Sequence, residues 1–412
     1  MRKMEQGVSL EHVLYLLVII LLTGMLVGRL SGLLKLPDVA LFLIAGIVLG
    51  PLLHWIHEPS SSFTNQFILT VGSTLILFDG GRNIRLAGLK KVWLTLTLLS
   101  IPGVLITCAI VAAASHWLLH LPWMYALLLG AIISSTDPAT LIPVFKQVRV
   151  RTKVRETVES ESAFNDATGS ILTFTLLGAL TGGGAISLGD SVKEFLITAL
   201  GGIGAGVLIG LALAFLTVHR KFGFLRDYAG IVMLVTAAGA YLAGDLLHVS
   251  GFMATFTAGL IWGNAELFGL DFADRKQELH HVAENLTVLL RMLIFVLLGS
   301  QVDFGVIGEY LVPSLGVIAI FMLIARPMTV LLCALPDTRA KWERNELLFM
   351  FWVRETGVIP AALSGMVVGM GIAHADIIAS VTFLAVLVTI LLQAGTTAYA
   401  ARRLGLEEKA EP

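Results

Sequence analysis

An acidic residue followed by a proline lies in the middle of a long apolar run. The run LLLGAIISSTDPATLIPVF has Asp137 near its centre, Pro138 directly after it and Pro143 further on, with hydroxyl side chains at 134, 135 and 136. Proline removes a backbone donor and clashes with the preceding turn, so a helix should be broken here. Freed carbonyls, hydroxyls and one carboxylate are oxygen ligands suited to a hard monovalent cation. The alternative is a proline kink with Asp137 as its cap, and Asp137 lies deep in the run for that role.

The next run, RETVESESAFNDATGSILTF, places several polar side chains on one side of a helix. Ser162 and Asp166 are four residues apart and share a face, and Glu159, seven before Asp166, falls on the same face. Glu161 and Asn165 occupy an adjacent stripe. We therefore expect Asp166 to be a second functional carboxylate and Glu161 to be a partner in a structural ion pair.

Three arginines, Arg291, Arg326 and Arg354, also lie inside apolar runs. A charge at the centre of a membrane helix costs about 2.5 kcal/mol or more, so each needs a partner. Glu161 is the obvious partner for Arg326. The sequence assigns no role to Arg291.

The composition explains why these charges have apolar neighbours. Of the 412 residues, 56% are hydrophobic and 14% are charged, whereas a soluble domain has about 25% charged residues. Polar residues are too few to cover a soluble globule, which excludes a soluble enzyme, and a net charge of −1 gives no reason to expect a nucleic-acid partner. The two cysteines form no metal-binding motif. The chain is predicted to be an all-α polytopic membrane protein.

Apolar runs that could cross a bilayer as a helix, about 20 residues each, recur along the chain. Thirteen are expected, at 11–30, 38–54, 65–80, 92–115, 122–146, 156–180, 194–218, 227–246, 248–263, 282–300, 310–335, 346–370 and 375–401. Lys and Arg gather in alternate loops, 22 against 3. Because basic residues concentrate on the cytoplasmic side, we expect a multi-pass protein of the cell (inner) membrane with its N-terminus outside and its C-terminus in the cytoplasm.

The twelfth run repeats the pattern of the fifth. It reads LLFMFWVRETGVIPAALSGMVVG and is interrupted at Gly357, Pro360 and Gly365. The charge alternation gives the two runs opposite directions. Two interrupted helices of opposite direction indicate an inverted-repeat transporter with a binding site at the midplane, where the broken helices cross.

These motifs together resemble the monovalent cation/proton antiporter superfamily, in its sodium/proton exchanger branch of NhaP type, over essentially the whole chain. The resemblance rests on the segments SerThrAspPro at 135–138, GluSerAlaPheAsnAsp at 161–166, LeuIleAlaArg at 323–326, Arg354 ahead of Gly357, and LeuPheAspGlyGly at 77–81. In the last segment Asp79 stands where the family has Glu. Arg354 is followed by Glu355 where the family has Gly, which leaves the local charge pairing open.

The resemblance implies a role for each matching residue. Asp166 would bind cation or proton in competition, with Asp137, Ser162 and the main-chain carbonyl of Thr136 as further Na⁺ ligands. Glu161 with Arg326 would be the core ion pair, and Arg354 would stabilise the crossed half-helices. Asn165 stands where the electrogenic branch has a second Asp, which favours one-for-one, electroneutral exchange.

The resemblance also implies an organisation. A homodimer is expected, with a dimerisation part at about 11–80 and 227–300, a mobile core at about 92–180 and 310–401, a linker helix at about 194–218 and a short cytoplasmic tail at 402–412. The expected partners are a monovalent cation, the proton and membrane lipid, and no cofactor is expected.

The expected function is transport and not catalysis. The leading hypothesis is exchange of Na⁺ for H⁺ by alternating access, with Li⁺ or K⁺ possible, and the alternative is a potassium/proton antiporter or a K⁺ efflux protein. An intramembrane aspartyl protease using Asp137 and Asp166 is disfavoured, because the sequence around them has no Gly-x-Gly-Asp pattern. The sequence does not rank the three cations.

Overall fold

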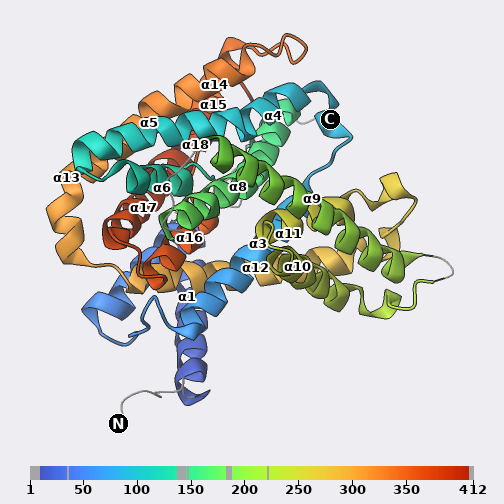
Figure 1. Ribbon diagram of the computed structural model, residues 1–412, viewed down its shortest axis with the longest axis horizontal. Coiled ribbons are helices and arrows are strands. Elements are labelled where there is room, and N and C mark those ends of the chain that lie inside the picture. Colours follow the sequence, from blue (N-terminus) through green and yellow to red (C-terminus); the bar gives the residue numbers. More distant parts are fainter. Residues whose placement is uncertain are drawn as a thin grey trace.

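The computed structural model describes residues 10–34, 37–136, 145, 148–181, 188–219 and 222–407, and helices dominate it (Figure 1). The helices of the first half are α1 (Leu10–Leu34), α2 (Asp38–Ile47), α3 (Phe63–Asn83), α4 (Trp93–Ser100), α5 (Pro102–Leu119), α6 (Trp123–Ile133), α8 (Thr152–Thr181) and α9 (Leu188–Val218). Those of the second half are α10 (Ala229–Leu246), α11 (Gly251–Gly263), α12 (Lys276–Ser300), α13 (Phe304–Ile320), α14 (Arg326–Ala334), α15 (Arg344–Trp352), α16 (Val358–Gly369), α17 (Ala375–Thr389) and α18 (Gly395–Arg403).

Short helical turns extend or connect these elements. Three are π turns, η1 (Val48–Leu52), η7 (Phe321–Ala325) and η8 (Ile390–Ala394), and the others are the 3-10 turns η2 (Gly88–Lys91), η4 (Arg226–Tyr228), η5 (Ala265–Phe268) and η6 (Ala273–Arg275). Among the described residues, β-type pairing is limited to one antiparallel bridge between Val150 and Glu407.

Each of the thirteen predicted apolar runs overlaps one helix or a series of consecutive helices. The run 310–335, for example, corresponds to α13, η7 and α14, and the run 375–401 to α17, η8 and α18. Seven helical stretches of the described chain are long and apolar enough to cross a membrane, and four shorter helices are apolar as well. The predicted all-α membrane fold is confirmed.

The two expected helix interruptions differ in how far the structure describes them. The twelfth run divides into α15 and α16, separated by non-helical residues 353–357. Of the three expected interruption points only Gly357 lies in this break. Pro360 and Gly365 lie within α16, Pro360 in its first turn, where proline is tolerated. In the fifth run α6 ends at Ile133, and Ser135 and Thr136 are no longer helical, but the continuation at 137–144 lies outside the described residues. The crossing of two broken helices therefore stays a prediction.

Close approach of helices depends on small residues, as is common in membrane proteins. A Cβ on Gly81 of α3 would lie 2.2 Å from the carbonyl oxygen of Phe256 in α11, and a Cβ on Gly259 of α11 would lie 2.0 Å from that of Phe78 in α3. Both distances are too short for any side chain, so these glycines let the two backbones touch. The α3–α11 pair is thereby held in one register.

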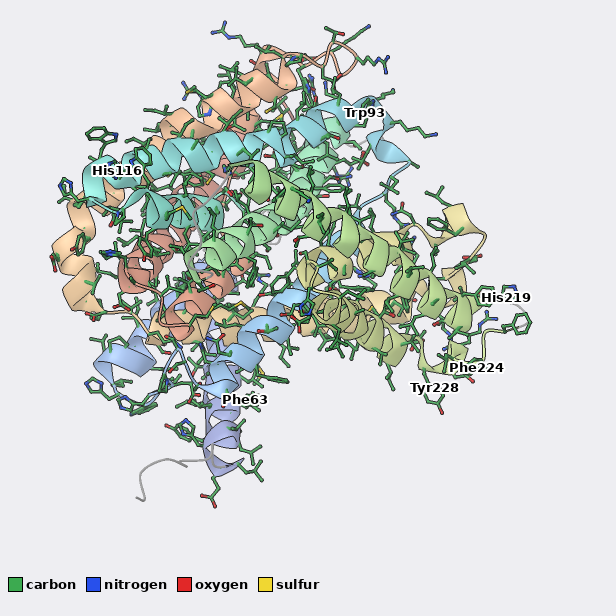
Figure 2. All side chains as sticks on the ribbon, in the orientation of Figure 1. Phe63, Trp93, His116, His219, Phe224 and Tyr228 are labelled. Carbon is green, nitrogen blue, oxygen red and sulfur yellow. The ribbon has the colours of Figure 1, made fainter. Side chains whose placement is uncertain are left out.

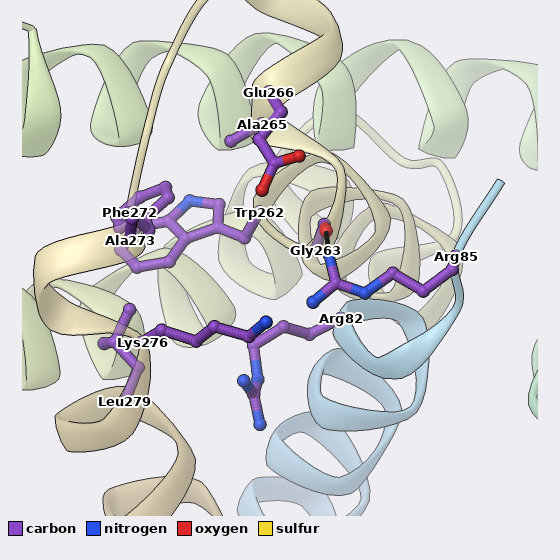
Figure 3. A pocket seen from close by; sticks show the side chains of 10 residues that line it. All are labelled: Arg82, Arg85, Trp262, Gly263, Ala265, Glu266, Phe272, Ala273, Lys276 and Leu279. Atoms are coloured by element: carbon purple, nitrogen blue, oxygen red, sulfur yellow. Dashed lines mark hydrogen bonds between the residues drawn. The ribbon is translucent and has the colours of Figure 1, made fainter. Parts of the chain in front are cut away.

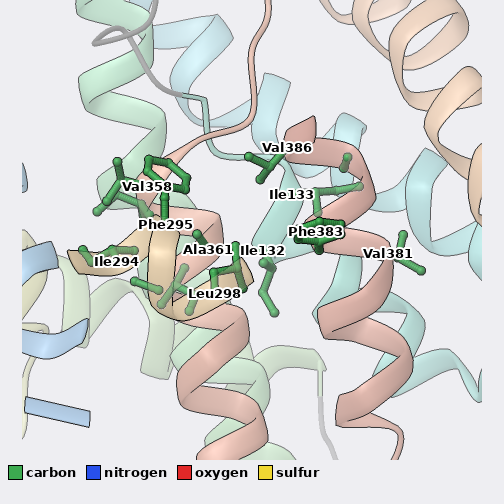
Figure 4. Packing of buried hydrophobic residues seen from close by; sticks show 14 of the residues in the cluster. Ile132, Ile133, Ile294, Phe295, Leu298, Val358, Ala361, Val381, Phe383 and Val386 are labelled. Carbon is green, nitrogen blue, oxygen red and sulfur yellow. The ribbon is translucent and has the colours of Figure 1, made fainter. Parts of the chain in front are cut away.

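The largest apolar core joins the interrupted helices to their neighbours. Ile133 of α6, Phe295 of α12, Ala361 of α16 and Phe383 of α17 meet there, and all are buried (Figure 4). Large aromatic side chains at the ends of helices instead project outward, among them Phe63, Trp93 and Tyr228 (Figure 2). Aromatic residues at helix ends are typical of the membrane–water interface.

Candidate functional site

The site begins where α6 stops. Its C-cap is Ser134, after which the chain extends through Ser135 and Thr136. All three side chains are buried. A buried helix end leaves backbone groups without helical partners, and these must be satisfied by other elements.

Helix α8 supplies those partners from one face. The Oδ1 atom of Asn165 accepts a hydrogen bond from the backbone N–H of Thr136 (3.1 Å), and its Nδ2 donates to Thr136 Oγ1 (2.9 Å). Thr136 Oγ1 also lies 2.8 Å from Ser162 Oγ. Asn165 and Ser162 therefore hold the non-helical chain that follows α6 against α8.

Asp166 is the buried carboxylate at this junction. Its Oδ1 accepts a hydrogen bond from the hydroxyl of Ser135, and the residue is 6% exposed. The structure thus brings together Asp166, Asn165, Ser162 and Thr136, four of the residues chosen from the sequence. It adds Ser135, which lies in the SerThrAspPro motif but was not chosen as a ligand. Asp137, the other expected carboxylate ligand, lies outside the described residues.

An ion pair fixes α8 to the second interrupted run. Arg326 Nη1 lies 2.5 Å from Glu161 Oε1, and its Nη2 lies 3.0 Å from Oε2, a fork-like contact between two buried side chains. Arg326 also donates to the carbonyl oxygens of Met350 (2.7 Å) and Val353 (3.3 Å) at the end of α15. One guanidinium thus joins α14, α8 and the break between α15 and α16.

Arg354 connects the two interruptions directly. Its Nη2 donates to the carbonyl oxygen of Ser134 (2.6 Å), and its guanidinium carbon lies 5.1 Å from the centre of the Phe321 ring. The carbonyl end of a helix carries partial negative charge, so a cation placed there stabilises the end of α6. Glu355 is fully buried beside it.

A cavity of about 350 Å³ lies between α3 and α8. Gly80 and Asn83 line it from α3, and Glu156, Glu159 and Ala163 line it from α8. Glu159 is two turns from Asp166 on the same face of α8, and the lining of the cavity on α8 ends at Ala163, about one turn before Asp166.

The structure gives Arg291 a partner that sequence reasoning missed. Its Nη2 lies 2.7 Å from Asp38 Oδ1, at the first residue of α2. Asp38 stands at the edge of an apolar run, where acidic residues are common and need no explanation. The sequence indicated only that Arg291, a cation inside an apolar run, needs an acidic partner. It did not indicate which one, because nothing in the sequence shows that α2 and α12 are neighbours.

Comparisons with known proteins place the chain among cation/proton antiporters. The family model described as "Sodium/hydrogen exchanger, transmembrane" matches residues 17–403. Na(+)/H(+) antiporter 1 of Methanocaldococcus jannaschii is 33% identical over 84% of this chain and 80% of its own length. K(+)/H(+) antiporter NhaP of Alkalimonas amylolytica is 29% identical over 90% of this chain, which spans 63% of that protein.

A solved structure has the same fold over nearly the whole chain. The structure of the sodium proton antiporter MjNhaP1 from Methanocaldococcus jannaschii at pH 8 superposes with a TM-score of 0.86 at 30% identity. The match covers 96% of this chain and 99% of that one.

Proposed function

The chain belongs to the sodium/hydrogen exchanger family, and from this premise we propose that it is a secondary antiporter that exchanges a monovalent cation for H⁺ at Asp166. The observation that carries the proposal is the buried Asp166 carboxylate, which faces a non-helical chain held by Asn165 and Ser162. Non-helical backbone at membrane depth is tolerated where it lines a site or a cavity.

The exchange follows from the oxygen atoms around Asp166. A dehydrated cation needs several oxygen ligands, and Asp166, Ser162, the Thr136 carbonyl and Asp137 are the proposed set. A proton needs only one carboxylate oxygen, and the other can keep the hydrogen bond from the Ser135 hydroxyl. Because cation and proton use the same carboxylate, each excludes the other, and only one is carried at a time.

We propose Na⁺ as the principal cation, with Li⁺ and K⁺ as alternatives. Relatives of similar identity carry the names Na(+)/H(+) antiporter and K(+)/H(+) antiporter, so the choice rests on ligand distances within the site. Asn165 cannot ionise, and this supports a one-for-one, electroneutral cycle.

Alternating access would be divided between two parts of the molecule. In the proposal, α4, α5, α6, α8 and α13 to α18 move against α1 to α3 and α10 to α12, with α9 as the linker. The cavity beside Glu156 and Glu159 would admit cations from the cytoplasm to the polar face of α8. We also propose a homodimer through the part formed by α1 to α3 and α10 to α12. The exposed side chains of Leu14, Val18 and Leu22 on α1 would then contact the partner subunit or lipid.

The test is transport by the purified protein in liposomes. Wild-type protein should move protons when NaCl, LiCl or KCl is added, reported by a pH-sensitive dye, and Asp166→Asn should abolish the signal while remaining folded. The matched control is Asp245→Asn, which removes an exposed carboxylate at the end of α10. Normal exchange by Asp166→Asn would refute the site. A potassium diffusion potential set with valinomycin should leave the Na⁺/H⁺ rate unchanged, and a change would refute electroneutrality.

A further inference from the structure

A second polar cavity lies at the other side of α3, away from α8. It has a volume of about 170 Å³ and sits between the end of α3, the end of α11 and the start of α12. Figure 3 shows the side chain of Lys276 running in from the left below the indole of Trp262, and Arg85 extending toward them from the right. Nothing in the proposed transport cycle uses this cavity.

The lining of the cavity is positively charged on balance. Arg82 is offset by Asp79, whose Oδ1 lies 2.6 Å from its Nη2. Arg85 donates one hydrogen bond, to the carbonyl oxygen of Gly263 (2.6 Å), and has no acidic partner within the described part of the chain. Lys276 has no ion pair there either, so two cations face one lining carboxylate, that of Glu266.

An unpaired hydrogen-bond donor lies in the same wall. Trp262 is 4% exposed and its ring stacks on Phe272, with 4.7 Å between centroids. Its Nε1–H is buried and has no acceptor among the described residues. A buried donor without a partner is costly, so an acceptor is expected to come from outside the chain. The first turn of α12 adds the positive end of a helix dipole.

We propose that this cavity binds a phosphate group. Arg and Lys side chains, an indole N–H and a helix N-terminus are all donors to phosphate oxygens. The cavity is smaller than the roughly 300 Å³ at which sites for drug-sized ligands begin. It therefore suits the phosphate of a lipid headgroup or of a small soluble ester.

Its surroundings favour a phospholipid. The cavity lies where α3 and α11 end and α12 begins, and Leu267 and Phe268 beside it are exposed apolar side chains. An acyl chain would contact such residues. Because the lining belongs to α3, α11 and α12, the bound phosphate links three helices and stabilises the native state by mass action.

The experiment is thermal unfolding of the delipidated, full-length protein in detergent. The probes are phosphatidylglycerol, phosphatidylcholine, glycerol 3-phosphate and inorganic phosphate, each titrated against the apparent melting temperature. We expect phosphatidylglycerol to raise it in a saturable way and phosphatidylcholine to have little effect, because its choline cation is repelled by Arg85 and Lys276. If glycerol 3-phosphate and inorganic phosphate raised the melting temperature at concentrations comparable to that of phosphatidylglycerol, the bound phosphate would come from a soluble compound and not from a lipid.

Substitutions of opposite sign make the assignment specific. Lys276→Gln should weaken the apparent affinity about tenfold by removing a charge-assisted contact, whereas Glu266→Gln should strengthen it. Trp262→Phe keeps the ring and removes the donor, and should also weaken binding. Lys90→Gln, a change of the same kind on η2 outside the cavity, is the matched control and should alter nothing. Equal responses from Lys276→Gln, Glu266→Gln and Lys90→Gln would overturn the proposal.

Discussion

Two arginines buried among the membrane helices, Arg326 and Arg291, find very different partners. Arg326 makes a two-point contact with Glu161, and the side chains are 1% and 3% exposed. It also donates to two carbonyl oxygens at the end of α15. Arg291 makes a single contact with Asp38, whose side chain is 33% exposed, and its Nε has no partner within the described residues.

The difference shows what each pair does for the molecule. Water does not reach the Glu161–Arg326 pair, so loss of either partner leaves a charge that cannot be solvated. Asp38 is partly open to water, and a long arginine side chain can turn its charged end toward such a region. The first pair therefore determines whether α8 and the α15–α16 break stay together, while the second strengthens the contact between α2 and α12.

The largest effect should come from Glu161→Ala. Removing one member of a fully buried pair costs about 3–5 kcal/mol, so we expect a strongly lowered apparent melting temperature and poor expression. Exchange should fall because Arg326 no longer holds α8 to the break. The measurement is thermal unfolding in detergent beside transport in liposomes.

A double variant separates lost pairing from lost packing. Glu161→Met with Arg326→Met removes both charges, so it should be more stable than either single variant. If Glu161→Ala were instead stable and showed only weakened cation affinity, Glu161 would belong to the ligand set and not to the structural pair.

A smaller effect is expected from Asp38→Asn. The change removes the charge of the partner and keeps its shape, and a hydrogen bond to a charged group is worth about 1.5–3 kcal/mol. Partial solvation of Arg291 should place the loss at or below the lower end of that range. Thermal unfolding measures it, with transport expected to persist. A loss as large as that of Glu161→Ala would show that exposure of the partner does not govern the cost.

The same comparison explains what could be predicted from sequence. The spans follow from runs of apolar residues, which any bilayer-crossing helix must have. The Glu161–Arg326 contact could be proposed because both charges stand inside such runs, where each requires a partner. Arg291 and Asp38 could not be paired, since the pattern along a helix fixes its faces but not which helix lies against them.

At the candidate site, too, the sequence predicted which residues share a helix face but not every contact that they make. The i, i+4 spacing placed Ser162 and Asp166 on one face, and they do lie together against the end of α6. Ser135 also contacts Asp166, and this contact depends on how the chain turns after α6. Residue types do not determine that turn.

The smallest effect should come from an ion pair outside the membrane, between Arg226 and Asp274. Both side chains are largely in water, 50% and 74% exposed, although they are in direct contact. Exposed pairs contribute about 0–1 kcal/mol, since solvent screens the charges and ordering two long side chains costs entropy. Asp274→Asn should therefore change the melting temperature far less than Asp38→Asn. Raising the salt concentration should bring the melting temperature of Asp274→Asn to that of the wild type, because salt screens exposed charges. Thermal unfolding of Glu161→Ala, Asp38→Asn and Asp274→Asn at low and high salt tests the whole series. If Asp274→Asn lost as much stability as Asp38→Asn, and salt did not change that loss, burial would not determine how much each ion pair contributes.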